Sequence, residues 1–164
     1  MYSLETERLL IRPLEMDDYD FIRKLVNTEG WLSNIGDRNV TSRDDAKAYI
    51  RKILGNRKYH CSTFRLKEIN EPIGIITFIY RDTQKFPDIG YAMLPEYERK
   101  GFAYEAVKRY LNKLKAEKIT DRVGAITLPA NKRSIRLLER LGFSLAYRFI
   151  ENNSEIALYL TEMN

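Results

Sequence analysis

The sequence predicts an α/β protein in which helices cover both faces of a mixed, mostly antiparallel sheet. Three strand-like runs follow one another mid-chain with only turns between them, which favours an antiparallel meander. Amphipathic helix patterns precede and follow this meander. A later strand pattern is flanked by two helix patterns, which requires a crossover but does not suit a doubly wound nucleotide fold. The 164 residues suit one domain, residues 1–164.

The N-terminal third is predicted to hold one strand and two helices. Leu9–Leu14 forms a strand, and Met16–Val26 forms a short helix with one apolar face. Ser42 and Asp45 have the spacing of a capping box, which places the start of the second helix there. Gly55-Asn56 marks its end.

The remaining two thirds continue the β-α-α-β-β-β-α-β-α-β-β order. The meander strands are predicted over Tyr59–Leu66, Ile73–Tyr80 and Asp88–Met93. Helix patterns cover Gly101–Glu117 and Asn131–Leu141, the second ending at Gly142. Further strands are predicted over Val123–Thr127, Ser144–Ile150 and Glu155–Leu160. An exposed final strand would offer an edge to a second copy, so a homodimer is one expectation.

Composition narrows the function classes. The N-terminus, Met1 to Glu7, lacks a secretory signal pattern, and no apolar run is long enough to span a membrane, so we expect a cytoplasmic protein. One cysteine, Cys61, excludes an internal disulfide, and with the single His60 it excludes a His/Cys-rich zinc site. His60 and Cys61 point to opposite faces of a strand, which favours a buried thiol beside a surface imidazole over a catalytic pair. We expect no metal.

The net charge of +5 favours anionic ligands, but the basic residues are scattered along the chain. No nucleic-acid-binding motif and no cluster of base-stacking aromatic residues is present, so nucleic acid is not the expected partner. A basic RNA-associated protein stays open as an alternative, and a steep salt dependence of RNA binding would support it.

The segment from Ile89 to Ala106 carries the strongest chemical signal. A strand runs into a basic, glycine-containing turn that opens directly into a helix. Unpaired N–H groups and a partial positive charge at a helix N-terminus attract phosphate oxygens. Gly101 and Ala103 lack bulk, and Arg99 and Lys100 add charge. The spacing fits neither a Walker loop nor a dinucleotide fingerprint.

Several segments together resemble the GNAT acetyltransferase superfamily over nearly the whole chain. Glu98–Ala103 is similar to its pyrophosphate loop, Q/R-x-x-G-x-G/A, with Glu98 departing at the first position. Asn131–Phe143 resembles the family's following helix motif. Thr6–Leu14 and Ile89-Gly90-Tyr91 resemble the branch that holds the ribosomal-protein (Rim-type) N-terminal acetyltransferases.

This resemblance implies the GNAT fold, acetyl-coenzyme A as cosubstrate, and a set of binding residues. Backbone groups of Met93 and Leu94 would bind the pantetheine and acetyl group, where a bulge around Ala92 to Leu94 would separate two strands. Asn131 and Ser134 would face the cofactor arm, although Asn131 also suits a helix cap and Ser134 a crowded helix face. The pyrophosphate would be held by Arg99, Lys100, Gly101, Phe102, Ala103 and Tyr104.

The implied reaction is direct attack of a primary amine on the acetyl thioester. A base must first deprotonate the amine, and Asp88 is the candidate, the alternative being a turn-ending aspartate in water. The Met93 amide is the candidate donor to the thioester oxygen. Many relatives protonate the leaving thiolate with a tyrosine at the place of Leu138, so Ser134 is expected to substitute here.

The acceptor follows only from the branch that the chain resembles, which favours a protein or peptide N-terminus. A small amine or amino acid stays open, and a polyamine suits a basic protein less well. The leucine at position 138 also leaves open a catalytically silent domain that binds an acyl-coenzyme A as a sensor.

Overall fold

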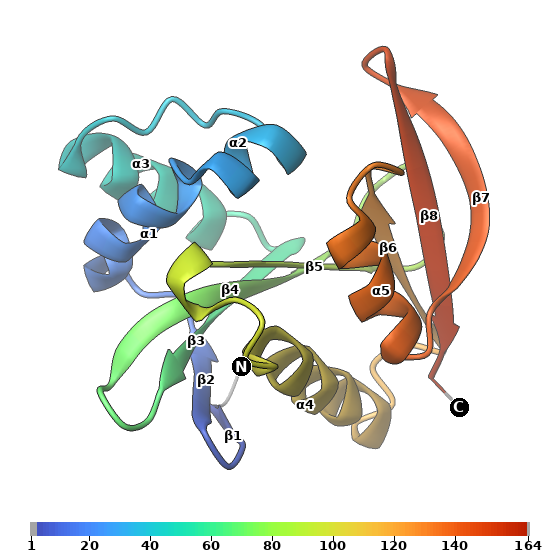
Figure 1. Ribbon diagram of the computed structural model, residues 1–164, viewed down its shortest axis with the longest axis horizontal. Coiled ribbons are helices and arrows are strands. Elements are labelled where there is room, and N and C mark those ends of the chain that lie inside the picture. Colours follow the sequence, from blue (N-terminus) through green and yellow to red (C-terminus); the bar gives the residue numbers. More distant parts are fainter. Residues whose placement is uncertain (1–2, 164) are drawn as a thin grey trace.

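The computed structural model describes residues 3–163, and these form an eight-stranded sheet in the order β1-β2-β3-β4-β5-β6-β8-β7 (Figure 1). Neighbouring strands are antiparallel except for β5 and β6, which are parallel. The predicted mixed, mostly antiparallel sheet is therefore confirmed. The strands are β1 (Leu4–Glu5), β2 (Leu9–Pro13), β3 (Tyr59–Leu66), β4 (Glu71–Ile79), β5 (Asp88–Met93), β6 (Arg122–Thr127), β7 (Ser144–Glu151) and β8 (Ser154–Glu162).

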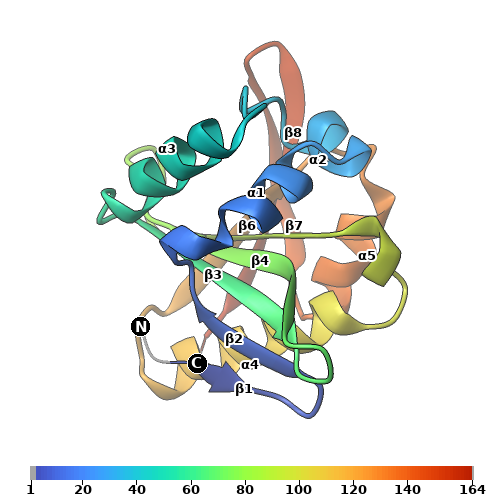
Figure 2. The ribbon, with the colours of Figure 1, turned by 90° about the vertical axis from the view of Figure 1, so that its left-hand side faces the viewer.

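Helices pack on both faces of this sheet, as predicted (Figure 2). Ile75 and Ile76, adjacent in β4, belong to different apolar clusters because successive side chains of a strand point to opposite faces. The Ile75 cluster contains side chains of the first three helices, and the Ile76 cluster contains those of the last two. The helices are α1 (Tyr19–Val26), α2 (Glu29–Asn34), α3 (Arg43–Leu54), α4 (Phe102–Ala116) and α5 (Lys132–Arg140).

Local signals located the helix ends well. Ser42 Oγ accepts the Asp45 N–H at 3.1 Å, and the Asp45 carboxylate accepts the Ser42 N–H at 2.8 Å, which confirms the capping box of α3. The helix predicted over Met16–Val26 begins instead with a 3-10 turn, Met16–Asp18, before α1. Within residues 3–163, no helix has both the length and the apolar character that a membrane span requires.

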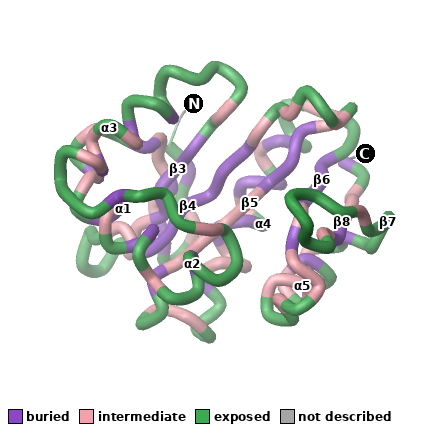
Figure 3. Tube along the Cα trace, turned by 90° about the horizontal axis from the view of Figure 1, so that it is seen from above, coloured by how far each residue is buried: buried purple, intermediate pink, exposed green. Residues whose placement is uncertain are grey.

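Three expectations about the elements were wrong or incomplete. The short elements β1 and α2 were not predicted, because two and six residues are too few to show a hydrophobic period. The final strand β8 is not an exposed edge, since it lies between β6 and β7. The edge at this end of the sheet is β7, which is exposed along most of its length, whereas β3 and β4 are largely buried (Figure 3).

The parallel neighbours β5 and β6 diverge almost as soon as they meet. Asp88 pairs with Gly124, and no further pair joins these two strands (Figure 1). On its other side, β5 pairs with β4 in one continuous register that reaches Met93. The bulge predicted around Ala92 to Leu94 is therefore absent from the β4–β5 ladder, and the separation arises because β6 turns away.

Candidate active site

A cleft of about 1520 Å³ occupies the region where β5 and β6 diverge. Its walls come from β5, β6, α5, the loop before α4, and α2. Lys100, Phe102 and Leu94 are the predicted site residues that do not line it. The predicted site residues that do line it are Asp88, Met93, Arg99, Gly101, Ala103, Tyr104, Asn131 and Ser134.

The N-terminus of α4 opens onto this cleft without a side-chain cap. Gly101, with φ 80°, precedes the helix, and its carbonyl accepts the first helical bond from the Glu105 N–H at 3.0 Å. The N–H groups of Phe102, Ala103 and Tyr104 therefore have no partner within the helix. By contrast, α3 and α5 are capped by side chains. The uncapped first turn is a suitable site for an anion.

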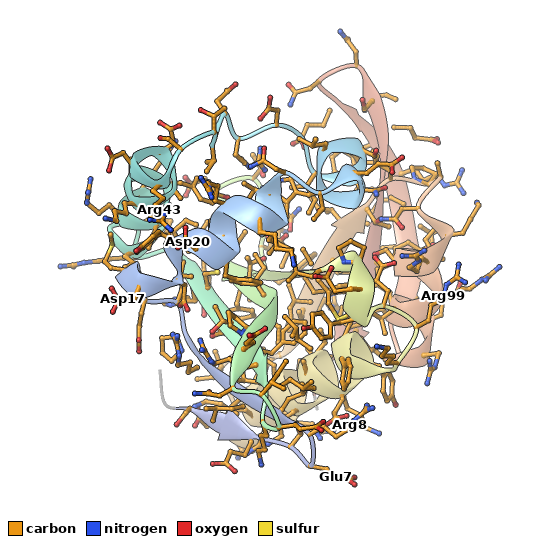
Figure 4. All side chains as sticks on the ribbon, turned by 60° about the vertical axis from the view of Figure 1, so that its left-hand side comes forward. Glu7, Arg8, Asp17, Asp20, Arg43 and Arg99 are labelled. Atoms are coloured by element: carbon orange, nitrogen blue, oxygen red, sulfur yellow. The ribbon has the colours of Figure 1, made fainter. Side chains whose placement is uncertain are left out.

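Arg8 braces the loop before α4, a role that sequence reasoning missed. Its Nη1 donates to the Lys100 carbonyl at 3.0 Å, and its Nη2 lies 2.5 Å from Glu105 Oε2. Its guanidinium also covers the Phe102 ring, 4.4 Å from the centroid. Figure 4 shows Arg8 coming from the β1–β2 turn and Arg99 from the loop itself. These contacts hold the loop and keep Phe102 buried.

Several cations surround the same end of the cleft. Arg99 lines it with φ 62°, and Glu98 forms an ion pair with Arg133 of α5. Glu98, the residue that differs from the loop motif, thus connects the loop to α5. Tyr104 lies under the Arg140 guanidinium, which is 4.6 Å from the ring centroid. This end of the cleft is therefore positively charged and suits phosphate groups.

Alternate residues of β5 point their backbone N–H and C=O groups toward the cleft. The Leu94 N–H donates to the Ile73 carbonyl at 2.9 Å, and the Leu94 carbonyl accepts the Tyr97 N–H at 3.1 Å. Both backbone groups of Leu94 are thus engaged, and its side chain is buried. Since N–H and C=O directions alternate along an antiparallel strand, those of Met93 and Tyr91 point away from β4, toward the gap.

Ser134 is held from two sides. Asn131 Oδ1 accepts its amide N–H at 3.2 Å, which confirms Asn131 as the cap of α5. The Tyr91 hydroxyl lies 2.9 Å from Ser134 Oγ. Burial raises the pKa of Tyr91 to about 12, although its hydrogen bond to Ser134 acts in the opposite direction. Leu138 is buried in the core and offers no acidic group.

Asp88 lies at the closed end of the diverging strands. It is 2% exposed, and Arg81 donates to both of its oxygens, at 2.8 and 3.2 Å. Burial raises the pKa of Asp88, and the Arg81 hydrogen bond partly offsets this. The interpretation as an aspartate in water is therefore wrong. Three residues of strand, about 10 Å of backbone, separate Asp88 from Tyr91.

The cleft is also lined by charged residues that sequence reasoning did not find. Glu29 and Arg38, in and after α2, line it together with Arg81 and with Glu151 at the end of β7. Glu29 and Arg38 were missed because α2 was not predicted. Among residues 3–163, no cluster of three or more His, Cys, Asp or Glu side chains could hold a metal ion.

Comparison with known proteins agrees with this geometry. Residues 8–144 match the model of the acetyltransferase (GNAT) domain. The chain is 28% identical over 139 residues to an uncharacterized N-acetyltransferase, YnaD, of Bacillus subtilis (strain 168), covering 85% of this chain and 81% of that protein.

Two solved structures share the fold at low identity. The ribosomal L7/L12 alpha-N-protein acetyltransferase RimL, in complex with coenzyme A, has a TM-score of 0.85 at 15% identity, with 98% of each chain covered. A chimera of the spermidine N-acetyltransferase SpeG from Vibrio cholerae has a TM-score of 0.79 at 18% identity, with 96% of each chain covered.

Proposed function

Because the chain belongs to the GNAT acetyltransferase family, we propose that it transfers the acetyl group of acetyl-coenzyme A to the N-terminal amine of a protein or peptide. Acetyl transfer is supported by one observation. A single cleft contains both the uncapped N-terminus of α4 and the unpaired backbone of β5. RimL, which acts on a protein N-terminus, has the same fold, but so does a spermidine acetyltransferase.

The residues present fit this acetyl donor, which is a substrate of the reaction. The free N–H groups of Phe102, Ala103 and Tyr104 would bind the pyrophosphate, with Arg99 adding charge. A residue with a Cβ at position 101 would be strained, since φ is 80°. Leu94 is left out of the proposed binding set because both of its backbone groups are engaged.

The open β5 backbone would orient the acetyl group and stabilise charge on its oxygen. We place this role on the Met93 and Tyr91 N–H groups, which point into the gap. Ser134 would supply the proton that the leaving sulfur needs. Asp88 would accept the amine proton through water, because about 10 Å of strand separates it from Tyr91.

The acceptor side of the cleft is polar and carries charges of both signs. Arg38 and Arg81 line this end beside Glu29 and Glu151, so its charges are mixed. A peptide N-terminus brings one cationic amine followed by a neutral polar backbone.

The test is coenzyme A release, followed as free thiol, with purified protein and a panel of acceptors. The panel holds peptides with varied N-termini, the same peptides with blocked N-termini, free amino acids and polyamines. We expect turnover with free peptide N-termini and none with the blocked controls. Transfer to polyamines alone would contradict the acceptor. Saturable acetyl-coenzyme A binding without any transfer would favour the silent sensor domain.

A further inference from the structure

The Tyr91 hydroxyl joins the central strand β5 to helix α5, and both elements line the cleft. It donates to the Ser134 carbonyl oxygen at 3.1 Å and lies 2.9 Å from Ser134 Oγ, a contact in which either hydroxyl can be the donor. The Ser134 amide N–H is bound on its other side by Asn131 Oδ1. Tyr91 thus holds the Ser134 hydroxyl and carbonyl against β5, while Asn131 caps the same turn of α5.

Tyr91 and Ser134 have only two hydroxyl protons between them, which limits the hydrogen bonds that the pair can form. The phenol carries one proton, the serine hydroxyl carries one, and the carbonyl can only accept. Burial raises the pKa of Tyr91 to about 12, so the phenol keeps its proton throughout the neutral range. The phenol proton can serve both oxygens of Ser134 as a three-centre hydrogen bond, and in that arrangement the serine proton is left free to point into the cleft.

We propose that Tyr91 is a positioning residue that directs the Ser134 hydroxyl toward the leaving sulfur of the acetyl donor. The inference rests on the proposed function, in which Ser134 supplies that proton. As the carbon–nitrogen bond forms, the carbon–sulfur bond breaks and the sulfur leaves with the electron pair. Ser134 gives its Oγ proton to the sulfur and takes one from the newly bonded nitrogen. Tyr91 keeps its own proton.

The hydrogen bond from Tyr91 to Ser134 Oγ becomes stronger as the serine proton is transferred. As the serine proton moves toward sulfur, negative charge grows on Oγ, and a hydrogen bond to a charged acceptor in a buried site is stronger than one to a neutral acceptor. Without the phenol, the Ser134 hydroxyl has no partner on β5 to fix its rotation. The serine proton would then no longer be directed into the cleft.

The first test compares Tyr91→Phe with the wild-type enzyme on the best acceptor of the panel. We expect kcat to fall about 10- to 100-fold while the KM for acetyl-coenzyme A changes less than about twofold. Tyr80→Phe removes the hydroxyl of a tyrosine outside the cleft and should leave kcat unchanged. Ser134→Ala should lose a similar factor, and the double variant should lose little more, because the two residues act as one unit.

A second test varies the leaving group, which a merely structural hydroxyl would not sense. With S-phenyl thioacetate, whose thiol leaves more readily, the wild-type to Tyr91→Phe rate ratio should fall below about threefold. An equal ratio with both donors would overturn the proposal. If the phenylalanine variant does not fold, 3-fluorotyrosine at position 91 makes the phenol a stronger donor and should raise kcat about 1.5- to 3-fold. A fall would contradict the role.

These experiments distinguish a failure of the role proposed for Tyr91 from a failure of the proposed function on which it rests. Wild-type kcat in Tyr91→Phe together with a loss in Ser134→Ala would overturn the role of Tyr91 and leave the proposed function standing. No transfer by the wild-type protein to any amine would overturn both.

Discussion

At the scale of single residues, a left-handed glycine sets the approach to the helix N-terminus. Gly101 and Gly142 both have positive φ, 80° and 90°, but of the two only Gly101 lines the cleft. A side chain at either position is strained, at a cost of about 1–2 kcal/mol. The pair therefore separates the effect of backbone strain from the effect on an anion site.

We expect Gly101→Glu to abolish acetyl-coenzyme A binding in calorimetry, because it adds bulk and a negative charge where the pyrophosphate would lie. Gly101→Ala should weaken binding less, since it adds strain without charge. Gly142→Ala, with comparable strain outside the cleft, should keep the wild-type affinity. Wild-type affinity in a folded Gly101→Glu protein would show that the donor binds elsewhere.

A second prediction at this scale concerns the proposed base. Asp88→Asn keeps the shape of the side chain but cannot accept a proton at neutral pH, so kcat should fall about 100-fold. Because burial raises the pKa of Asp88, the acidic limb of the wild-type pH–rate profile should lie above the ordinary aspartate range, and the variant should lose that limb.

The control is Asp82→Asn, which removes a nearby exposed carboxylate that pairs with Lys58 outside the cleft. It should leave the profile unchanged. If Asp88→Asn keeps kcat and the acidic limb, Asp88 only anchors Arg81 and the base lies elsewhere.

At the scale of elements, what could be predicted from sequence depended on how locally each feature is encoded. The capping box of α3 and the glycine turn before α4 involve residues within a few positions, and both were predicted. The brace from Arg8 to Glu105 and the contact from Tyr91 to Ser134 join residues far apart in the chain. They depend on how the strands and helices pack, which no spacing in the sequence reveals.

The wrong placement of β8 has the same cause. Strand patterns indicate that Ser144–Glu151 and Ser154–Glu162 form a hairpin, but not which of the two strands joins the sheet. The second strand pairs with β6, so the first becomes the edge. The two strands differ in burial, since β8 has buried positions facing the core and β7 has none.

The cap of α3 makes a pH prediction at this scale. Hydrogen bonds from the side chain and backbone of Ser42 and from Thr41 lower the pKa of Asp45 from the ordinary aspartate value of 3.8 to about 2. A lowered folded-state pKa means that the carboxylate stabilises the fold above pH 3.8 and that this contribution is lost as the pH falls through about 2.

Asp45→Asn should therefore lower Tm by a few degrees at pH 7, and the difference from wild type should shrink between pH 4 and pH 2. Asp44→Asn removes the same charge from the same turn of the helix and serves as the control in thermal melting. A Tm difference for Asp45→Asn that stays constant down to pH 2 would contradict the cap's contribution.

At the scale of the whole molecule, the sheet consists of two parts that meet at a single pair of residues. Strands β1 to β5 form one part and β6 to β8 the other, joined at Asp88 and Gly124. Elsewhere the cleft separates them, and the backbone of β5 is unpaired along the gap. A ligand that pairs with this backbone and reaches α5 would complete a missing strand position and couple the two parts.

Acetyl-coenzyme A should consequently stabilise the entire fold. A ligand at 100 times its Kd that binds the native state alone adds about 2.7 kcal/mol, which raises Tm by about 5–10 °C for a chain of this size. In amide NMR spectra, the Tyr91 and Met93 signals should shift on binding more than those of Ala92 and Leu94, whose N–H groups point toward β4. Gly101→Glu should show neither the gain in Tm nor these shifts. A gain in Tm with equal shifts at all four amides would mean that the donor stabilises the fold without pairing with β5.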